Sequence, residues 1–309
     1  MKIAMIGLGK MGANMAQRLI GGGHQVVAYD LNEAAIQAAE ANGALGARTL
    51  DEVAAKLESP RVAWVMVPSG KATESTINAL ADRFSPGDII IDGGNSNYKD
   101  SVRHAAELKE RGLNFVDVGT SGGIWGITEG YAMMIGGDEA AVESLRPIFE
   151  TLAPGSDLGW GRTGPAGAGH FVKMIHNGIE YGMMQAYAEG FELLEASAWE
   201  LDLAAIADLW NQGSVVRSWL LELAAAALAE DPGLDRVAGY VEDTGEGRWT
   251  VEQAIAHGVP MPAIAASLFV RFRSRQQDTF SGKMLAALRN EFGGHAVKAR
   301  DERPAGDQP

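Results

Sequence analysis

The sequence contains no cysteine among its 309 residues. Disulfide bonds and thiolate chemistry are therefore excluded, and the redox compartment is left open. It also has no stretch of about 18 apolar residues, since even the segment at 209–230 is interrupted by Arg217 and Glu222. The start, MKIAMIGLGKMG, breaks its short apolar run at Gly7 and lacks the long apolar region of a signal peptide. We expect a soluble, cytoplasmic protein that does not enter a membrane.

Basic residues are also scarce. The chain has 26 Lys and Arg against 40 Asp and Glu, which gives a formal net charge of −14. Nucleic-acid binding depends on basic side chains that neutralise phosphates, so this charge argues against a nucleic-acid partner. A small anionic ligand is compatible with it if a cationic pocket is built locally. The remaining composition, 46% hydrophobic and 21% charged, is globular and sufficient for two domains.

The first 30 residues have the pattern of a dinucleotide-binding βαβ unit. A strand expected at 2–6 leads into Gly7, Gly9 and Gly12 at the start of a helix, and a second strand is expected at 25–29. In this G-x-G-x-x-G turn the glycines allow a tight turn, close approach of a pyrophosphate and close helix–strand packing, respectively. Free N–H groups at the helix start would face the phosphates. We interpret the turn as a dinucleotide site.

Asp30 ends the second strand of this unit. A carboxylate there accepts hydrogen bonds from the adenosine ribose and repels a 2′-phosphate. The next residues, Leu31 and Asn32, provide no arginine for such a phosphate. The sequence therefore favours NAD, with NADP as a weaker cofactor. The alternative, that Asp30 only caps the following helix, fits the same pattern.

Strand-like and helix-like segments continue to alternate. RVAWVMVPSG, DIIIDGGNS and LNFVDVGTSGG are typical of strands that end in loops, and helices are expected around 33–42, 71–82 and 97–111. This alternation predicts a doubly wound, mostly parallel sheet of the Rossmann type, with ligands at the carboxyl ends of its strands. The small, glycine-rich ends suit close approach to a ligand, although turn chemistry alone explains any single loop equally well.

The second half is predicted to be all α. Alternation stops near 162–166, and the following sequence indicates helices at 167–197, 202–212, 215–230, 249–257 and 261–277. We predict a Rossmann-type α/β domain at 1–164, an all-α domain for substrate and dimerisation at 165–296, and a flexible tail at 297–309.

The first of these helices has polar residues where a core-facing stripe is expected. Lys173, His176, Asn177, Glu180 and Tyr181 follow i, i+3, i+4, i+7, i+8 spacing and share one face, which we call the polar face. Its neighbours are apolar or small nearly all round, which indicates a buried helix, whereas a solvated face is the simpler alternative. In a protected cleft, Lys173 with a lowered pKa accepts a proton and Glu180 with a raised pKa donates one.

With these motifs, the chain resembles 6-phosphogluconate dehydrogenases, the decarboxylating enzymes of the pentose phosphate pathway, in a short form. The resemblance extends from the glycine turn to RNEFGGH at 289–295 and rests on IIDGGNS, SGG at 121–123, HFVKMIHNGIEYGMMQ and GRWTVEQAIAHGVP. The shorter β-hydroxyacid dehydrogenases share Lys173 and Asn177 but lack the combination with His176, Glu180 and Tyr181.

The resemblance implies oxidation of 6-phospho-D-gluconate with hydride transfer to NAD(P), loss of CO2 and release of ribulose 5-phosphate. Lys173 would be the base at the C3 hydroxyl and Glu180 the acid at C2, and no metal is implied. The implied cofactor-binding residues are Gly7, Leu8, Gly9, Met11, Gly12, Asp30, Val67, Pro68 and Asn95. The implied substrate-binding residues are Asn95, Ser121, Gly122, Gly123, His176, Asn177, Tyr181 and Arg271, with Arg289 and His295 from the tail of a second subunit.

A homodimer with shared sites follows from this resemblance, and pairing of dimers into tetramers is left open. Without it, Arg271 is best explained as a helix-surface charge. Thr244 replaces the family's phosphate-binding lysine, so either Arg248 compensates or the phosphate is held less tightly. NADP forms have Asn-Arg-Ser/Thr at the place of residues 30–32. The competing functions are an NAD-dependent dehydrogenase of an unphosphorylated 3-hydroxy acid, such as 3-hydroxyisobutyrate, and a nucleotide-sensing protein without catalysis.

Overall fold

The computed structural model describes residues 1–298, so the predicted tail at 297–309 lies almost entirely outside the described residues. The chain divides into two compact units, an N-terminal unit, Met1–His176, and a C-terminal unit that begins at Asn177. This division falls within a long helix, whereas the last strand of the N-terminal unit ends at Gly164. The domain boundary between 164 and 165 stays a prediction.

The N-terminal unit is built on one sheet, which has eight strands in the described chain, in the order β3-β2-β1-β4-β5-β6-β7-β8. All neighbouring strands are parallel except β6 and β7, which are antiparallel. The doubly wound, mostly parallel sheet is therefore confirmed. Its strands are β1 (Lys2–Ile6), β2 (Gln25–Tyr29), β3 (Leu45–Ala47), β4 (Val62–Val65), β5 (Ile89–Asp92), β6 (Asn114–Ser121), β7 (Ala132–Gly137) and β8 (Trp160–Gly164).

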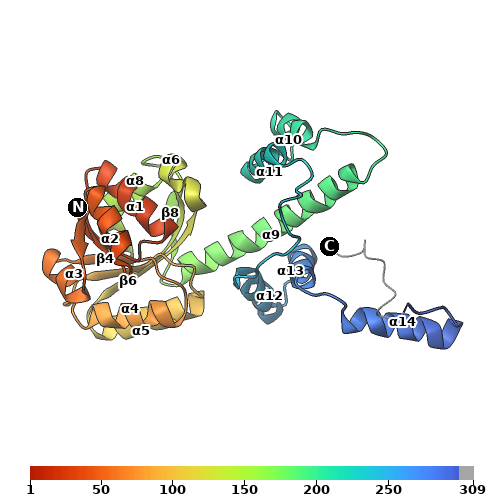
Figure 1. Ribbon diagram of the computed structural model, residues 1–309. Helices are drawn as coiled ribbons and strands as arrows, with labels where there is room; N and C mark the ends of the chain where they lie inside the picture. The colour runs from red at the N-terminus through yellow and green to blue at the C-terminus, as the bar shows by residue number, and fades with distance from the viewer. Residues whose placement is uncertain (299–309) are drawn as a thin grey trace. The chain divides into compact units, whose positions relative to one another are not determined.

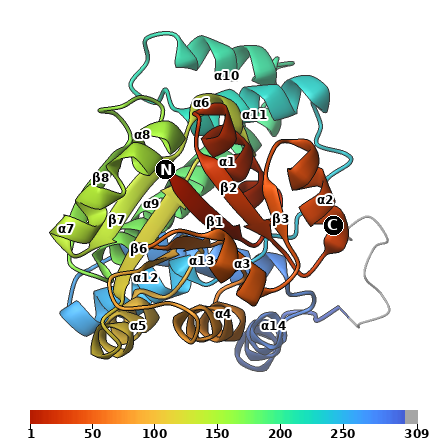
Figure 2. The same ribbon diagram turned by 90° about the vertical axis from the view of Figure 1, so that its left-hand side faces the viewer.

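Helices cover both faces of this sheet (Figures 1 and 2). Successive residues of β1 point to opposite faces, so that Ile3 and Met5 enter one core while Ala4 and Ile6 enter the other. The first core also contains α1 (Lys10–Gly21), α2 (Glu33–Ala41), α7 (Glu139–Ser144) and α8 (Arg146–Leu152). The second contains α3 (Leu50–Lys56), α4 (Lys71–Ala81) and α5 (Tyr98–Glu110). A 3-10 turn, η1 (Gly123–Trp125), and α6 (Gly126–Glu129) follow β6.

The C-terminal unit is helical, and its described part, 177–298, contains no strand. The helix α9 (Ala168–Glu195) contains residues of both units. It is followed by α10 (Leu203–Asn211), α11 (Trp219–Glu230), α12 (Glu246–His257), α13 (Pro262–Ser274) and α14 (Phe280–Gly293), and α10 packs against α11 (Figure 1). The predicted helical domain is confirmed. In the stretch 1–298, every helix is too short or too polar to cross a bilayer.

Several elements differ from the sequence-based prediction. The short elements β3, α3, β7, α7, α8 and β8 were not predicted, and neither was α14. The helix expected at 215–230 begins only at Trp219, because the Ser218 hydroxyl accepts a hydrogen bond from Leu221 N and caps the helix there.

Candidate functional site

The glycine turn between β1 and α1 has the geometry of a phosphate-binding loop. Gly7 has φ +97°, and a Cβ on Gly12 would lie 2.1 Å from the carbonyl oxygen of Gly7, so both positions require glycine. A Cβ on Gly9, in contrast, would meet nothing within 4 Å. Gly9 is the N-cap of α1 and has no side-chain cap. The helix start therefore offers backbone N–H groups beside open space, which fits a pyrophosphate.

Asp30 is fixed at the end of β2 by backbone amides. Its Oδ2 accepts a hydrogen bond from Leu8 N at 2.6 Å, and its Oδ1 accepts one from Asn32 N at 2.8 Å. The alternative that Asp30 caps α2 is wrong, because the cap is Asn32, whose side chain accepts from Ala34 N. The carboxylate is thus held next to the glycine turn, where a ribose would follow the phosphates.

Three further predicted loops follow β4, β5 and β6, which are neighbours in the sheet and parallel to one another. Their carboxyl ends therefore share one edge, as predicted. Val67 and Pro68 follow β4, Asn95 follows β5, and Ser121 ends β6. Beyond Ser121 the chain turns through two glycines with positive φ, Gly122 at +135° and Gly123 at +52°. The roles of these residues in binding stay predictions.

Lys173 is positioned by close packing of α9 on β6. It is 8% exposed. A Cβ on Gly119 of β6 would lie 2.2 Å from Lys173 Cβ, so only glycine permits this approach. Farther toward the start of α9, a Cβ on Gly169 would lie 2.5 Å from the carbonyl oxygen of Met134. The Nζ of Lys173 lies 3.4 Å from His176 Nδ1.

A buried carboxylate that was not predicted, Asp117, anchors the start of α9. It accepts hydrogen bonds from Gly167 N at 2.6 Å and His170 N at 2.8 Å. Asp117 lies on β6, two residues before Gly119. The strand therefore fixes the helix both by these hydrogen bonds and by the missing side chain of Gly119.

The rest of the polar face lies in the C-terminal unit, where it meets the start of α12 and the residues just before it. Asn177 Nδ2 lies 3.4 Å from Glu246 Oε1, and Thr244 Oγ1 donates to Glu246 Oε2 at 2.6 Å. The Tyr181 hydroxyl is 3.4 Å from Thr244 Oγ1, and Tyr181 is buried. Glu246, 3% exposed, therefore contacts the candidate ligand Asn177 directly and the candidate ligand Tyr181 through Thr244, and sequence reasoning had given it no role.

Arg271 of α13 completes this cluster. Its guanidinium carbon lies 3.4 Å from the centroid of the Tyr181 ring, and its Nη1 donates to the Glu242 carbonyl at 3.0 Å. The alternative of a plain helix-surface charge is therefore wrong, because the guanidinium stacks on the Tyr181 ring and is oriented by its hydrogen bond to the Glu242 carbonyl. Arg248 is instead ion-paired with Asp243. Burial alone would raise the pKa of Asp243, but the hydrogen bonds from Arg248 and Gly245 N, together with the charges of Arg248 and Arg275, outweigh it, and the pKa is lowered.

Burial along α9 is uneven. The members of the polar face are buried or half-buried, so the alternative of a solvated face is wrong. The apolar residues Val172, Ile179 and Met183, in contrast, are 37%, 52% and 38% exposed. The expectation of a helix buried all round is therefore also wrong. Arg289 lies on α14 and His295 follows it, both exposed, and their assignment to the site of a second subunit stays a prediction.

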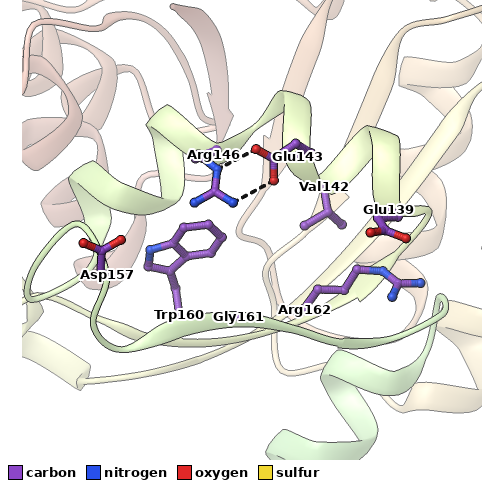
Figure 3. Close-up of a pocket in the computed structure, with 8 residues that line it drawn as sticks. All are labelled: Glu139, Val142, Glu143, Arg146, Asp157, Trp160, Gly161 and Arg162. Carbon is purple, nitrogen blue, oxygen red and sulfur yellow. Dashed lines mark hydrogen bonds and ion pairs between the residues drawn. The ribbon is translucent and has the colours of Figure 1, made fainter.

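A hollow of about 480 Å³ lies between α7, α8 and β8 (Figure 3). It contains none of the predicted site residues. Arg146 is held by Glu143 through hydrogen bonds of 2.6 and 2.8 Å, and it lies 4.9 Å from the centroid of the Trp160 ring (Figure 3). The Trp160 ring also stacks on Phe149. The side chains of Glu143, Arg146 and Trp160, which line the hollow, are thus paired with one another or with the core, and none of the predicted site residues reaches it. The hollow is therefore not the candidate site.

Two family models match this chain. Residues 2–161 match the NAD-binding domain of 6-phosphogluconate dehydrogenase, and residues 169–284 match the C-terminal domain of the same enzyme. The chain belongs to the 6-phosphogluconate dehydrogenase family. It is therefore an oxidoreductase with a Rossmann-type NAD-binding domain, and the predicted family and enzyme class are confirmed.

Individual relatives agree with this assignment. YqeC of Bacillus subtilis, provisionally named a 6-phosphogluconate dehydrogenase, is 48% identical over 97% of this chain and 100% of its own length. An NAD(+)-dependent, decarboxylating 6-phosphogluconate dehydrogenase of Haloferax volcanii is 42% identical over 98% of this chain and 100% of its own.

Solved structures show the same fold. The 6-phosphogluconate dehydrogenase of Plasmodium falciparum aligns with a TM-score of 0.81 and 28% identity, and the match covers 99% of this chain and 68% of the other. The 3-hydroxyisobutyrate dehydrogenase of Salmonella typhimurium aligns with a TM-score of 0.71 and 25% identity, over 86% and 91%.

Proposed function

We propose that the protein catalyses oxidative decarboxylation of 6-phospho-D-gluconate to D-ribulose 5-phosphate and CO2, with NAD preferred over NADP. The polar face of α9 carries this proposal. Its Lys173 is held against the carboxyl half of β6, and its Asn177 and Tyr181 join Glu246 and Arg271. An unphosphorylated 3-hydroxy acid would leave the stacked Arg271 without a counter-charge.

The glycine turn, Asp30 and the ends of β4 and β5 would hold the cofactor. Gly7, Leu8, Gly9, Met11 and Gly12 would surround the pyrophosphate, and Val67, Pro68 and Asn95 the nicotinamide half. Asp30, fixed by Leu8 N and Asn32 N, would accept hydrogen bonds from the ribose and disfavour a 2′-phosphate. When bound, NAD supplies the hydride acceptor for C3 of the sugar acid.

Lys173 would act at C3 and Glu180 at C2. The Lys173 amine takes the proton of the C3 hydroxyl as that carbon is oxidised. The C1–C2 bond then breaks to release CO2, and its electron pair moves through C2 toward the C3 oxygen, where the Lys173 ammonium stabilises the negative charge. Glu180 protonates C2 of the enediol. Lys173 and Glu180 are seven positions apart, which corresponds to about 10 Å along α9, so their two long side chains must converge to reach the neighbouring carbons C3 and C2.

The remaining polar groups would bind the two ends of the substrate. Ser121, Gly122, Gly123, His176 and Asn177 would hold the carboxylate and the hydroxyls. Tyr181 and Arg271 would hold the phosphate, which Arg289 and His295 of a second subunit would also contact. Thr244, at the place of the family's lysine, leaves the phosphate with one cation fewer, so we expect weaker phosphate binding than in relatives with that lysine.

A homodimer in the cytoplasm completes the proposal. Large apolar side chains on α14 are exposed, with Phe280 at 76% and Leu285 at 63%. Such exposure is typical of surfaces that a partner covers. A second copy would cover these residues and bring in the tail.

Kinetics with the purified protein test the reaction. We expect turnover with 6-phosphogluconate and NAD, equal amounts of CO2 and NADH, and a higher kcat/KM than with gluconate, 3-hydroxyisobutyrate or NADP. Lys173→Ala should lose several orders of magnitude in turnover while it still binds NADH. Equal rates with phosphorylated and unphosphorylated acids would overturn the substrate assignment. Full biological activity of Lys173→Ala would instead indicate a nucleotide sensor.

A further inference from the structure

Arg48 lies beside Asp30 although it is far from it in the sequence. The strands β2 and β3 are parallel, with Tyr29 opposite Ala47, so Asp30 and Arg48 are the next residues beyond this pair. Neighbouring strands lie about 4.8 Å apart, which places the Arg48 backbone next to the carboxylate assigned to the ribose. An arginine close to this acidic position is the usual ligand of an NADP 2′-phosphate.

The Arg48 side chain nevertheless points away from the carboxyl ends of the strands, where the ribose would lie. Its Nη2 donates to Glu33 Oε1 at 2.7 Å, and its Nη1 donates to Glu40 Oε1 at 2.6 Å. These carboxylates belong to the first and the last turn of α2, and both bind the guanidinium through a second hydrogen bond as well. A Cβ on Gly46 would lie 2.6 Å from Arg48 Nη1, so the guanidinium folds back over β3 at Gly46.

The cluster stays charged at neutral pH. Hydrogen bonds from Arg48 lower the pKa of both Glu33 and Glu40, and hydrogen bonds from Glu40 and Glu33 raise the pKa of Arg48. Two negative charges against one positive leave the cluster net negative. Its three side chains are 36–50% exposed, so the pairs are screened by solvent and can be exchanged for another anion.

We propose that Glu33 and Glu40 help to keep the cofactor site selective for NAD by holding Arg48 away from the position of a 2′-phosphate. Asp30 repels the phosphate directly, and the two glutamates withhold the cation that would bind it. Arg48 released from them can extend past the end of β3 to the ribose. This role rests on the NAD preference proposed above, but it does not depend on the identity of the sugar acid.

Fluorescence titration with NADPH and NADH, without any acid substrate, tests the role of Arg48. Asp30→Ser serves as the background, because it removes the direct repulsion. We expect Glu33→Gln with Glu40→Gln in this background to lower the Kd for NADPH about tenfold, since a charge-assisted pair with the phosphate is gained. The Kd for NADH should change less than about twofold, because NADH has no 2′-phosphate. Adding Arg48→Gln should cancel the gain.

Glu52→Gln is the matched control. Glu52 Oε2 accepts from the backbone N of Arg48 at 3.1 Å, so this variant removes a nearby negative charge without freeing the guanidinium. Gly46→Ala is an independent perturbation, because its Cβ would lie 2.1 Å from Glu40 Oε1 and displace that carboxylate. In the Asp30→Ser background, Gly46→Ala should therefore also lower the Kd for NADPH.

Three results would overturn the role given to Arg48: an unchanged Kd for NADPH, a gain that survives Arg48→Gln, or an equal gain from Glu52→Gln. A protein that fails to oxidise 6-phosphogluconate would still give interpretable titrations. The two proposals can therefore fail separately.

Discussion

Gly119→Ala tests whether the packing of α9 on β6 sets the position of Lys173, the proposed base. The new Cβ would lie 2.2 Å from Lys173 Cβ and 2.9 Å from the carbonyl oxygen of Gly169. Because one of these atoms is backbone, a change of side-chain rotamer cannot relieve the overlap. Gly119 has no positive φ, so alanine introduces no backbone strain at the position itself. The substitution therefore perturbs mainly the packing of β6 against α9.

The size of the effect follows from the overlap. Carbon atoms in contact lie about 3.5–4.0 Å apart, so the distance between the new Cβ and Lys173 Cβ is roughly 1.3–1.8 Å too short. If α9 takes up about 1 Å of this, the Lys173 amine is misplaced by a similar amount, which corresponds to about a hundredfold loss in kcat. Overpacking of this kind costs about 1–3 kcal/mol of stability, less than the free energy of unfolding of a typical domain. The variant should therefore stay folded.

Three measurements separate these contributions: kcat and KM with 6-phosphogluconate, the Kd for NADH, and the free energy of unfolding in urea. We expect kcat to fall about a hundredfold, which is about 2.7 kcal/mol in the barrier, while the Kd for NADH changes less than about threefold. Gly161→Ala is the control. It lies on β8 of the same sheet, a Cβ there would meet nothing within 4 Å, and its φ is not positive. This control should keep wild-type turnover.

Wild-type kcat in Gly119→Ala with unchanged stability would refute the idea that β6 positions Lys173. An equal loss in kcat and in NADH affinity would also contradict it, because the perturbation would then act on the cofactor site.

Two other substitutions probe the cluster around Thr244 and Glu246, and a third probes His104, a buried residue of α5. Glu246→Ala removes the shared acceptor of Asn177 and Thr244, so KM for 6-phosphogluconate should rise about tenfold in steady-state assays, with the Kd for NADH unchanged. Thr244→Lys adds a cation beside Tyr181, so KM for 6-phosphogluconate should fall roughly threefold to tenfold while KM for gluconate stays constant. His104→Phe should weaken acid destabilisation. Burial lowers the pKa of His104 below 6.5, so the unfolded state takes up a proton first and stability is lost as pH falls below about 6.5. Urea unfolding at about pH 7.5 and 5.5 should show a smaller difference in the variant.

Local sequence patterns were enough to predict much of the fold. The glycine turn, the strands on either side of it and the long helices all follow from short-range periodicity and capping. The three-residue strand β3 has too few residues for any period, and β7 ends in two glycines that hide its alternation. The start of α11 was missed because Ser218, an ordinary polar residue in the sequence, acts as its cap only in the folded chain.

The candidate site divides in the same way. Helical spacing alone grouped the polar face of α9. The partners of that face come from residues whose approach depends on tertiary structure, such as Gly119, Asp117 and Glu246. Gly119 contributes through the absence of a side chain, which lets α9 approach β6. No pattern within the sequence of β6 distinguishes it from a glycine required by a turn.

Arg48 illustrates how such tertiary proximity changes a functional conclusion. Inspection of residues 31 and 32 finds no arginine after Asp30, yet the register of β3 on β2 places one in the adjacent strand. Cofactor preference should therefore depend on both strand ends and on α2, whose two glutamates hold that arginine. It follows that Asp30→Ser alone should shift the ratio of kcat/KM values only part of the way toward NADP. The same substitution combined with Glu33→Gln and Glu40→Gln should shift it about tenfold further, because one arginine–phosphate pair is added. If Asp30→Ser alone produced the full shift, Asp30 would be the only determinant, and the glutamates would serve stability alone.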